Sequence, residues 1–155
     1  MIVTQTPLRI GLVGGGTDLP AYYREHGGRV LNAAIDKYVY VIVKQRFDDD
    51  IYVNYSKKEV VSRVEDIEHE LVREAMHMSG VRNGVEITTL ADIPSAGSGL
   101  GSSSSVTVGL LHALFAYQGH QVSAEELAER ACAIEIDRCR KPIGAGSPSP
   151  RGAGR

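Results

Sequence analysis

The chain has 155 residues, a net charge of −2 and a hydrophobic content of 43%, which are ordinary values for one globular domain. This charge balance excludes the clustered basic surface that nucleic-acid binding requires, and no apolar run approaches the ~18 residues that span a bilayer. The N-terminus, with Arg9 inside its first apolar segment, lacks a signal-peptide pattern. These features predict a cytoplasmic protein with neither a nucleic-acid nor a membrane partner.

The N-terminal part of the chain is predicted to be β-structure followed by a turn. Residues 2–13 alternate apolar and polar side chains, which indicates either a strand pair or one long strand that bends at Pro7. A glycine-rich turn follows at residues 14–20. From the residues alone, Thr17 or Asp18 caps the short helix after this turn.

The middle of the chain predicts a hairpin and then a helix. Residues 39–46 and 51–55 are typical of strands, and 51–55 is interpreted as the return strand after an acidic turn at 47–50. The three aspartates of this turn are either a metal site or a solvated hairpin tip, and the turn preference of aspartate favours the tip. Residues 66–78 predict an amphipathic helix that ends at Gly80.

A run of glycine and serine lies between a predicted strand at residues 85–90 and a predicted apolar helix at 106–117. This order places a flexible turn at a helix N-terminus, where backbone N–H groups and the helix dipole favour an anion. A flexible linker is the alternative interpretation. The candidate phosphate-binding residues are Pro94, Gly97, Gly99, Leu100, Gly101, Ser102, Ser103 and Ser104.

The last predicted helix begins at Ser123, which forms a capping-box pattern with Glu126. Glu135 lies near the end of this helix. The local sequence favours a surface pair between Glu135 and either Arg138 or Lys141, although the isoleucines on both sides of Glu135 suggest partial burial.

The glycine and serine run resembles the phosphate loop of the GHMP kinases, Pro-x-x-x-Gly-Leu-Gly-Ser-Ser-Ala, with Ser104 in place of the alanine. The N-terminal part resembles the substrate motif of the sugar-type members of that family. The most similar branch contains heptose 7-phosphate kinases, and fucose-kinase-like enzymes are nearby. The N-terminal resemblance is carried by residues 7–10, 14–20, 26–32 and 35–41.

The resemblance implies an α+β fold in which helices cover one face of a mixed sheet, as in the ribosomal protein S5 domain 2-like domains. It implies a kinase that uses ATP and Mg²⁺. Its small-molecule substrate would be a sugar phosphate, D-glycero-D-manno-heptose 7-phosphate, which the kinase would phosphorylate at the anomeric hydroxyl. A fucose-type or other GHMP kinase and a non-catalytic nucleotide-binding fragment remain alternatives.

The resemblance also implies roles for individual residues. Arg9 would face the transferring phosphoryl group, and the run from Pro94 to Ser104 would bind the ATP phosphates. Ser103 and Glu135 would bind Mg²⁺. The residues expected to hold the sugar hydroxyls are Gly15, Gly16, Thr17 and Asp18.

The resemblance covers about residues 3–144, so residues 1–144 are expected to form a GHMP kinase N-terminal domain. Residues 145–155 contain only Gly, Ala, Ser, Pro and Arg, which predicts an aberrant, disordered tail. The catalytic aspartate that the family places near Ser147 and the C-terminal domain are missing from the sequence. We therefore expect weak or no turnover, and self-association through the face that the second domain would cover.

Overall fold

The computed structural model of the chain describes residues 1–94 and 100–139. Its five-stranded sheet has the order β1-β2-β5-β3-β4. Strand β3 is parallel to β5, and the other neighbouring strands are antiparallel, so the sheet is mixed. The strands are β1 (Ile2–Val13), β2 (Leu31–Gln45), β3 (Ile51–Asn54), β4 (Lys58–Val61) and β5 (Val85–Ala91).

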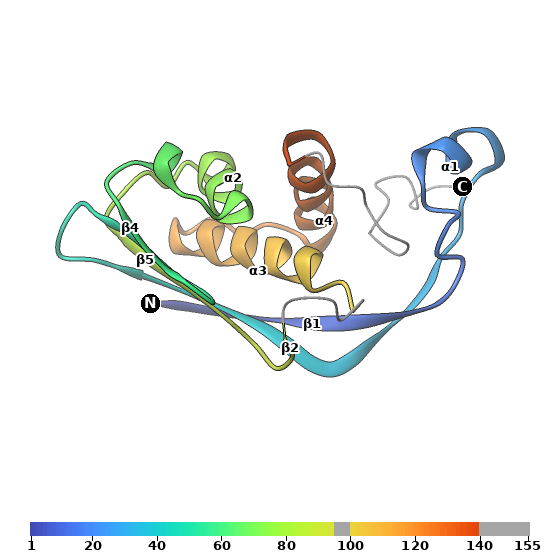
Figure 1. The fold of residues 1–155 in the computed structure, drawn as a ribbon, viewed down its shortest axis with the longest axis horizontal. Helices are drawn as coiled ribbons and strands as arrows, with labels where there is room; N and C mark the ends of the chain where they lie inside the picture. Colours follow the sequence, from blue (N-terminus) through green and yellow to red (C-terminus); the bar gives the residue numbers. More distant parts are fainter. Residues whose placement is uncertain (95–99, 140–155) are drawn as a thin grey trace.

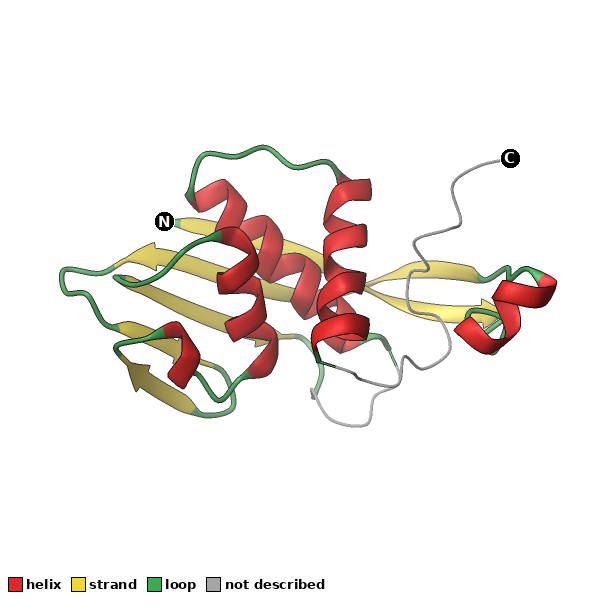
Figure 2. Cartoon of the chain, turned by 90° about the horizontal axis from the view of Figure 1, so that it is seen from above, coloured by secondary structure: helices red, strands yellow, loops and turns green. Residues whose placement is uncertain are grey.

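Three helices lie together on one face of this sheet (Figures 1 and 2). They are α2 (Glu70–Ser79), α3 (Ser102–Tyr117) and α4 (Ala124–Cys132). A 3₁₀ turn, η1 (Val64–Asp66), precedes α2, and a π-helical segment, η2 (Ala133–Arg138), continues α4. This architecture confirms the predicted α+β fold. Within the described residues, none of the helices has the length and apolar character that crossing a membrane requires.

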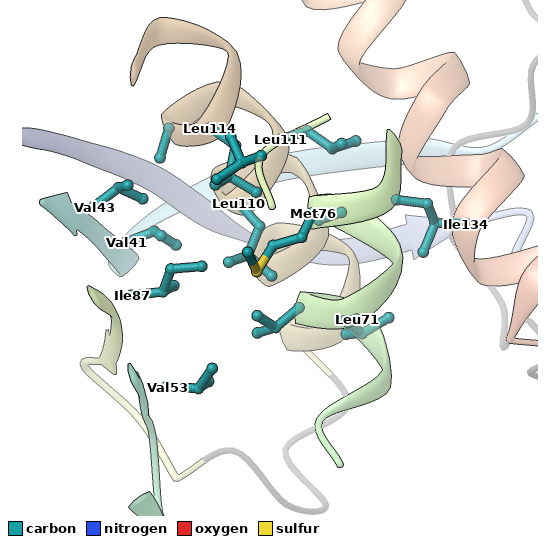
Figure 3. Packing of buried hydrophobic residues seen from close by; sticks show 14 of the residues in the cluster. Val41, Val43, Val53, Leu71, Met76, Ile87, Leu110, Leu111, Leu114 and Ile134 are labelled. Atoms are coloured by element: carbon teal, nitrogen blue, oxygen red, sulfur yellow. The ribbon is translucent and has the colours of Figure 1, made fainter. Parts of the chain in front are cut away.

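Helix α3 lies at the centre of the core, where it contacts β1 and β2 on one side and α2 and α4 on the other. Its side chains Leu110, Leu111 and Leu114 are fully buried, and they pack against residues of the sheet and of α2 in Figure 3. The backbone of α3 approaches the sheet closely, because a Cβ added at Gly109 would lie 3.1 Å from a methyl group of Val41. The same backbone accepts a 3.0 Å hydrogen bond from the hydroxyl of Thr4.

Strand β1 is one long strand with an irregularity next to Pro7, which is the second of the two alternatives that the sequence left open. Its register with β2 shifts between Pro7 and Arg9. Such bulges bend a strand and change the direction of its side chains. Leu8 at the shift is fully buried in the core, and Arg9 follows it at the edge of the helical layer.

The outer ends of β1 and β2 form an arm that extends beyond the helical layer and carries α1 (Pro20–His26) at its tip (Figure 2). In this arm Arg9 to Val13 pair with the β2 residues Leu31 to Ala34. Leu12, Val13 and Leu31 are each more than half exposed. The arm is therefore held by backbone hydrogen bonds rather than by a core of its own.

Two expectations about the middle of the chain were wrong. Residues 51–54 form a strand, but β5 lies between it and β2, so the two segments are not a hairpin. Helix α2 begins at Glu70 rather than at Asp66. The carboxylate of Glu59 accepts hydrogen bonds from the backbone N–H groups of Glu68 (2.6 Å) and His69 (3.2 Å). These bonds keep the residues before Glu70 outside the helix.

The predicted starts of two other helices also differ from the structure. Helix α3 begins at Ser102, four residues before the apolar run, so the serines form its first turn. Helix α1 has Leu19 at its N-cap, so neither Thr17 nor Asp18 caps it. The capping interpretation of Asp18 is therefore wrong. At α4, in contrast, the side chain of Ser123 caps the helix by accepting from the N–H of Glu126, as predicted.

Candidate active site

The N-terminus of α3 is attached to the bulged part of β1 by two hydrogen bonds. The backbone N–H of Arg9 donates to the carbonyl of Leu100 at 3.4 Å, and the hydroxyl of Ser105 donates to the carbonyl of Pro7 at 3.0 Å. These bonds connect residues more than 90 positions apart in the sequence. They place the end of the glycine and serine run directly beside the first strand.

The N-cap of α3 is Gly101, in the left-handed conformation with φ +68°. A glycine has no side chain that could cap the helix, and the N–H groups of a first helical turn have no acceptor within the helix. Together with the dipole of a 16-residue helix, they favour a bound anion at this end. The hydroxyl oxygen of Ser103 is shielded from solvent and has no hydrogen-bond partner within residues 1–94 and 100–139.

The guanidinium group of Arg9 lies against this helix end. A Cβ added at Gly101 would lie 3.1 Å from Cζ and 3.2 Å from Nη2 of Arg9, so the glycine leaves the room that the guanidinium occupies. Burial lowers the pKa of Arg9, while the nearby negative charges of Asp18 and Glu135 raise it. An arginine remains charged under such influences. Arg9 therefore adds a fixed positive charge to the helix end.

Glu135 is only 7% exposed and faces α3. Its carboxylate accepts hydrogen bonds from the hydroxyls of Thr107 (2.9 Å) and Ser104 (3.2 Å). The expectation of a surface pair for Glu135 was therefore wrong. Ser104, rather than Ser103, is the serine that contacts Glu135 in this structure. Thr107 was missed by the sequence analysis, although its spacing of three residues from Ser104 places both on one side of the helix.

The oxygen atoms around Glu135 fit a magnesium ion. Mg²⁺ prefers one or two carboxylate ligands together with hydroxyl, water and phosphate oxygens. A buried carboxylate beside the hydroxyls of Ser104 and Thr107, at a helix end suited to phosphate, offers such a set. The oxygen of Ser103 is shielded from solvent and has no hydrogen-bond partner among the described residues, so it is available to a ligand at this helix end.

The glycine-rich turn of the arm places Asp18 near Arg9. One carboxylate oxygen of Asp18 is buried, and its charge acts on the guanidinium of Arg9. The hydroxyl of Thr17 lies within hydrogen-bonding distance of the backbone of Gly14 and Arg29. Of the four residues expected to bind the sugar, Asp18 is thus the one whose charge acts on Arg9, next to the N-terminal end of α3. Gly15 and Gly16 belong to the same turn.

A pocket of about 280 Å³ lies beside the segment that leads into the glycine and serine run. Its lining is mostly apolar and aromatic. The rings of Tyr55 and His69 meet edge to face at 4.7 Å. Desolvation, and a hydrogen bond to Glu59, raise the pKa of Tyr55 to about 12, so its phenol is neutral. The lining residues are Val39, Tyr55, Ser56, His69, Thr89, Leu90, Ala91, Ile93 and Val106.

The sequence analysis did not find this pocket, because its walls come from five separate segments of the chain.

Two of the residues that the sequence analysis named are not described by the structure. Gly97 and Gly99 lie outside the described residues. Pro94 is exposed at the end of the segment that follows β5, and Leu100 and Ser102 flank Gly101 at the start of α3.

Comparisons with known proteins agree with this geometry. Residues 54–147 match the family model described as GHMP kinases N terminal domain. A D-glycero-alpha-D-manno-heptose 7-phosphate kinase of Campylobacter jejuni is 34% identical over 149 residues, which are 86% of this chain and 43% of that protein. An L-fucokinase/L-fucose-1-P guanylyltransferase of Bacteroides fragilis is 28% identical over 84% of this chain and 17% of its own length.

The fold is also similar to solved structures. A D-glycero-D-manno-heptose 1-phosphate kinase from Bacteroides thetaiotaomicron superposes with a TM-score of 0.84 at 27% identity, over 95% of this chain and 52% of the other. The chain spans less than half the length of the two curated relatives. The match over residues 54–147 covers more than half of this chain, which therefore belongs to the GHMP kinase family.

Proposed function

We propose that this chain provides the nucleotide and sugar sites of an ATP-dependent sugar kinase whose acceptor is a heptose 7-phosphate. The observation that supports it most is the position of Arg9. Its guanidinium lies on Gly101 at the N-terminus of α3, within reach of the charges of Asp18 and Glu135. The positive charge of Arg9 therefore lies at the helix end proposed to bind phosphate, and it interacts with the carboxylate proposed to bind the metal and with the carboxylate of the glycine-rich turn.

Each group has a distinct role in phosphoryl transfer. The first turn of α3 binds the ATP phosphates through its N–H groups and serine hydroxyls. Arg9 stabilises the negative charge that the phosphate oxygens carry during transfer. Glu135 and Ser103 or Ser104 hold Mg²⁺, which neutralises phosphate charge when it is bound. Thr107 keeps the carboxylate of Glu135 oriented.

The pocket that contains Tyr55 and His69 is the proposed site of the adenine base. It lies next to Ile93, immediately before the run that binds the phosphates, and an apolar pocket with aromatic walls suits a flat base. Glu59 stabilises this wall, because its carboxylate accepts from the N–H of His69 and from the phenol of Tyr55.

Asp18 is the proposed ligand of the sugar. A carboxylate accepts hydrogen bonds from two vicinal hydroxyls at once, and the position of Asp18 near Arg9 would bring the sugar toward the transferred phosphate. The choice of a heptose 7-phosphate, phosphorylated at its anomeric hydroxyl, rests on the 34% identity to a kinase named for that substrate. Fucose-type substrates are the second candidate, because the next relative is a fucokinase.

The test is a binding and turnover panel. The chain is titrated with ATP and Mg²⁺ and with D-glycero-D-manno-heptose 7-phosphate, L-fucose and mevalonate, and product is followed by ³¹P NMR. We expect binding of ATP and of the heptose phosphate with weak or no turnover, and an at least tenfold loss of sugar affinity in Asp18→Asn, of the order that lost charge-assisted hydrogen bonds cause. Asp49→Asn, an exposed aspartate outside the site, is the matched control.

Three outcomes would contradict parts of this proposal. Preference for L-fucose or mevalonate would change the substrate. Binding of ATP without any sugar would favour the alternative of a non-catalytic nucleotide-binding chain. Rapid turnover that Asp18→Ala abolishes would contradict the expectation of weak activity.

We further propose that the exposed apolar side chains of the arm promote self-association. Val13 and Leu31 are neighbours across β1 and β2 and are 68% and 59% exposed. We expect concentration-dependent dimers in sedimentation velocity, and a loss of dimers in Leu31→Glu. Phe47→Glu is the control, because Phe47 is 94% exposed but follows the opposite end of β2. Monomers at all concentrations, or equal effects of both variants, would contradict the proposal.

A further inference from the structure

The hydroxyl of Thr17 is engaged by the protein itself. It lies 2.8 Å from the carbonyl of Gly14 and 2.8 Å from the carbonyl of Arg29, and it accepts a 3.1 Å hydrogen bond from the N–H of Arg29. A threonine hydroxyl has one hydrogen and two acceptor positions. The surrounding backbone therefore uses its hydrogen and at least one of its lone pairs.

Two glycines show how closely the chain segments meet at this hydroxyl. A Cβ added at Gly14 would lie 2.0 Å from the carbonyl oxygen of Arg29, and a Cβ added at Gly28 would lie 2.1 Å from the carbonyl oxygen of Thr17. Any side chain at either position would push the two segments apart. The glycines permit backbone contact, and the Thr17 hydroxyl then bridges the contact with hydrogen bonds.

Asp18 is the next residue along the chain, and its position depends on this contact. The apolar side chains around this turn are only partly covered: Leu19, the N-cap residue of α1, is 43% exposed, and Tyr22 of α1 is 45% exposed. Nevertheless, one oxygen of Asp18 is buried, and its charge acts on Arg9 in the main body of the fold. The start of this turn is held by the hydroxyl bonds of Thr17 and by the 2.9 Å hydrogen bond from its backbone N–H to the carbonyl of Gly14; only the hydroxyl bonds also reach Arg29.

We propose that Thr17 is a positioning residue: its hydrogen bonds to Gly14 and Arg29, the Thr17 latch, hold the turn that carries Asp18, and so keep the Asp18 carboxylate where its charge reaches Arg9. Thr17 itself then contributes no hydroxyl to the sugar, in contrast to the role that the family resemblance implied. The role of Asp18 toward a sugar rests on the proposed function. The effect of the Asp18 charge on Arg9 does not.

The experiment compares Thr17→Val, Thr17→Ser and Asp18→Asn in the full chain by ¹⁵N NMR, without ligand. Valine keeps the shape of threonine and removes the hydroxyl, whereas serine keeps the hydroxyl. We expect Asp18→Asn and Thr17→Val to move the Nε–H signal of Arg9 in the same direction, and Thr17→Ser to leave it near its original position. The Arg29 amide should exchange about tenfold faster in Thr17→Val, because it loses its acceptor.

Three results would overturn the latch. The first is a Thr17→Val variant whose Arg9 signal stays at its original position while Asp18→Asn moves it. The second is an Arg9 signal that keeps its original position in the Asp18→Asn variant. The third is a serine variant that behaves like the valine variant. A titration with heptose 7-phosphate separates the two proposals, because failure of the unchanged chain to bind it contradicts the function, whereas the ligand-free signals alone decide the latch.

Discussion

Leu110→Ala is expected to lower the free energy of unfolding by about 2–5 kcal/mol, the range for large-to-small substitutions in a packed core. Leu110 is fully buried in α3, where it lies among the side chains of the sheet and of α2 (Figure 3). The neighbouring Gly109 backbone is already in close contact with β1 and β2, so the helix cannot move inward to fill the cavity. Urea unfolding followed by circular dichroism measures the change.

Leu90→Ala is the matched control for this substitution. This variant makes the same leucine-to-alanine change at a residue near the end of β5 that is 54% exposed. An exposed position of this kind should change stability by less than about 0.5 kcal/mol. Similar losses in the two variants would mean that α3 does not form the centre of the core.

Glu135→Gln is expected to reduce the affinity for a non-hydrolysable ATP analogue at least about tenfold when Mg²⁺ is present, by analogy with the effect of altering a metal site. The analogue should bind nearly as well as before when Mg²⁺ is absent. The amide keeps the size of the carboxylate but loses the negative charge that holds the cation. Calorimetric titrations with and without Mg²⁺ separate the two effects.

The control for this variant is Glu129→Gln, which removes an exposed carboxylate from helix α4. It should bind the analogue like the unchanged chain under both conditions. An equal loss of affinity with and without Mg²⁺ in Glu135→Gln would show that the residue acts through the fold, by means of its bonds to Ser104 and Thr107, rather than through the metal.

Local patterns in the sequence were sufficient for much of the fold. The apolar run from Val106 marked α3, Gly80 marked the end of α2, and Ser123 marked the start of α4, and all three are found in the structure. These signals act over a few residues, because hydrogen bonding at a helix end and apolar periodicity are local properties. The glycine and serine run before α3 was likewise recognisable as an anion-binding helix start, and that role remains a proposal.

Only the tertiary structure decided how the candidate site is assembled. The local sequence alone favoured a surface pair for Glu135, but the carboxylate is buried next to Thr107 of α3, in line with the partial burial that its flanking isoleucines suggested. The capping role that the local sequence suggested for Asp18 was wrong as well, because Leu19 is the N-cap of α1, while the hydroxyl of Thr17 bonds to the backbone of Arg29. Both outcomes depend on contacts between residues distant in the sequence, whose energies no local pattern records. The sequence by itself therefore determined most of the helices and the family resemblance, whereas long-range packing decided the strand order and which polar groups meet.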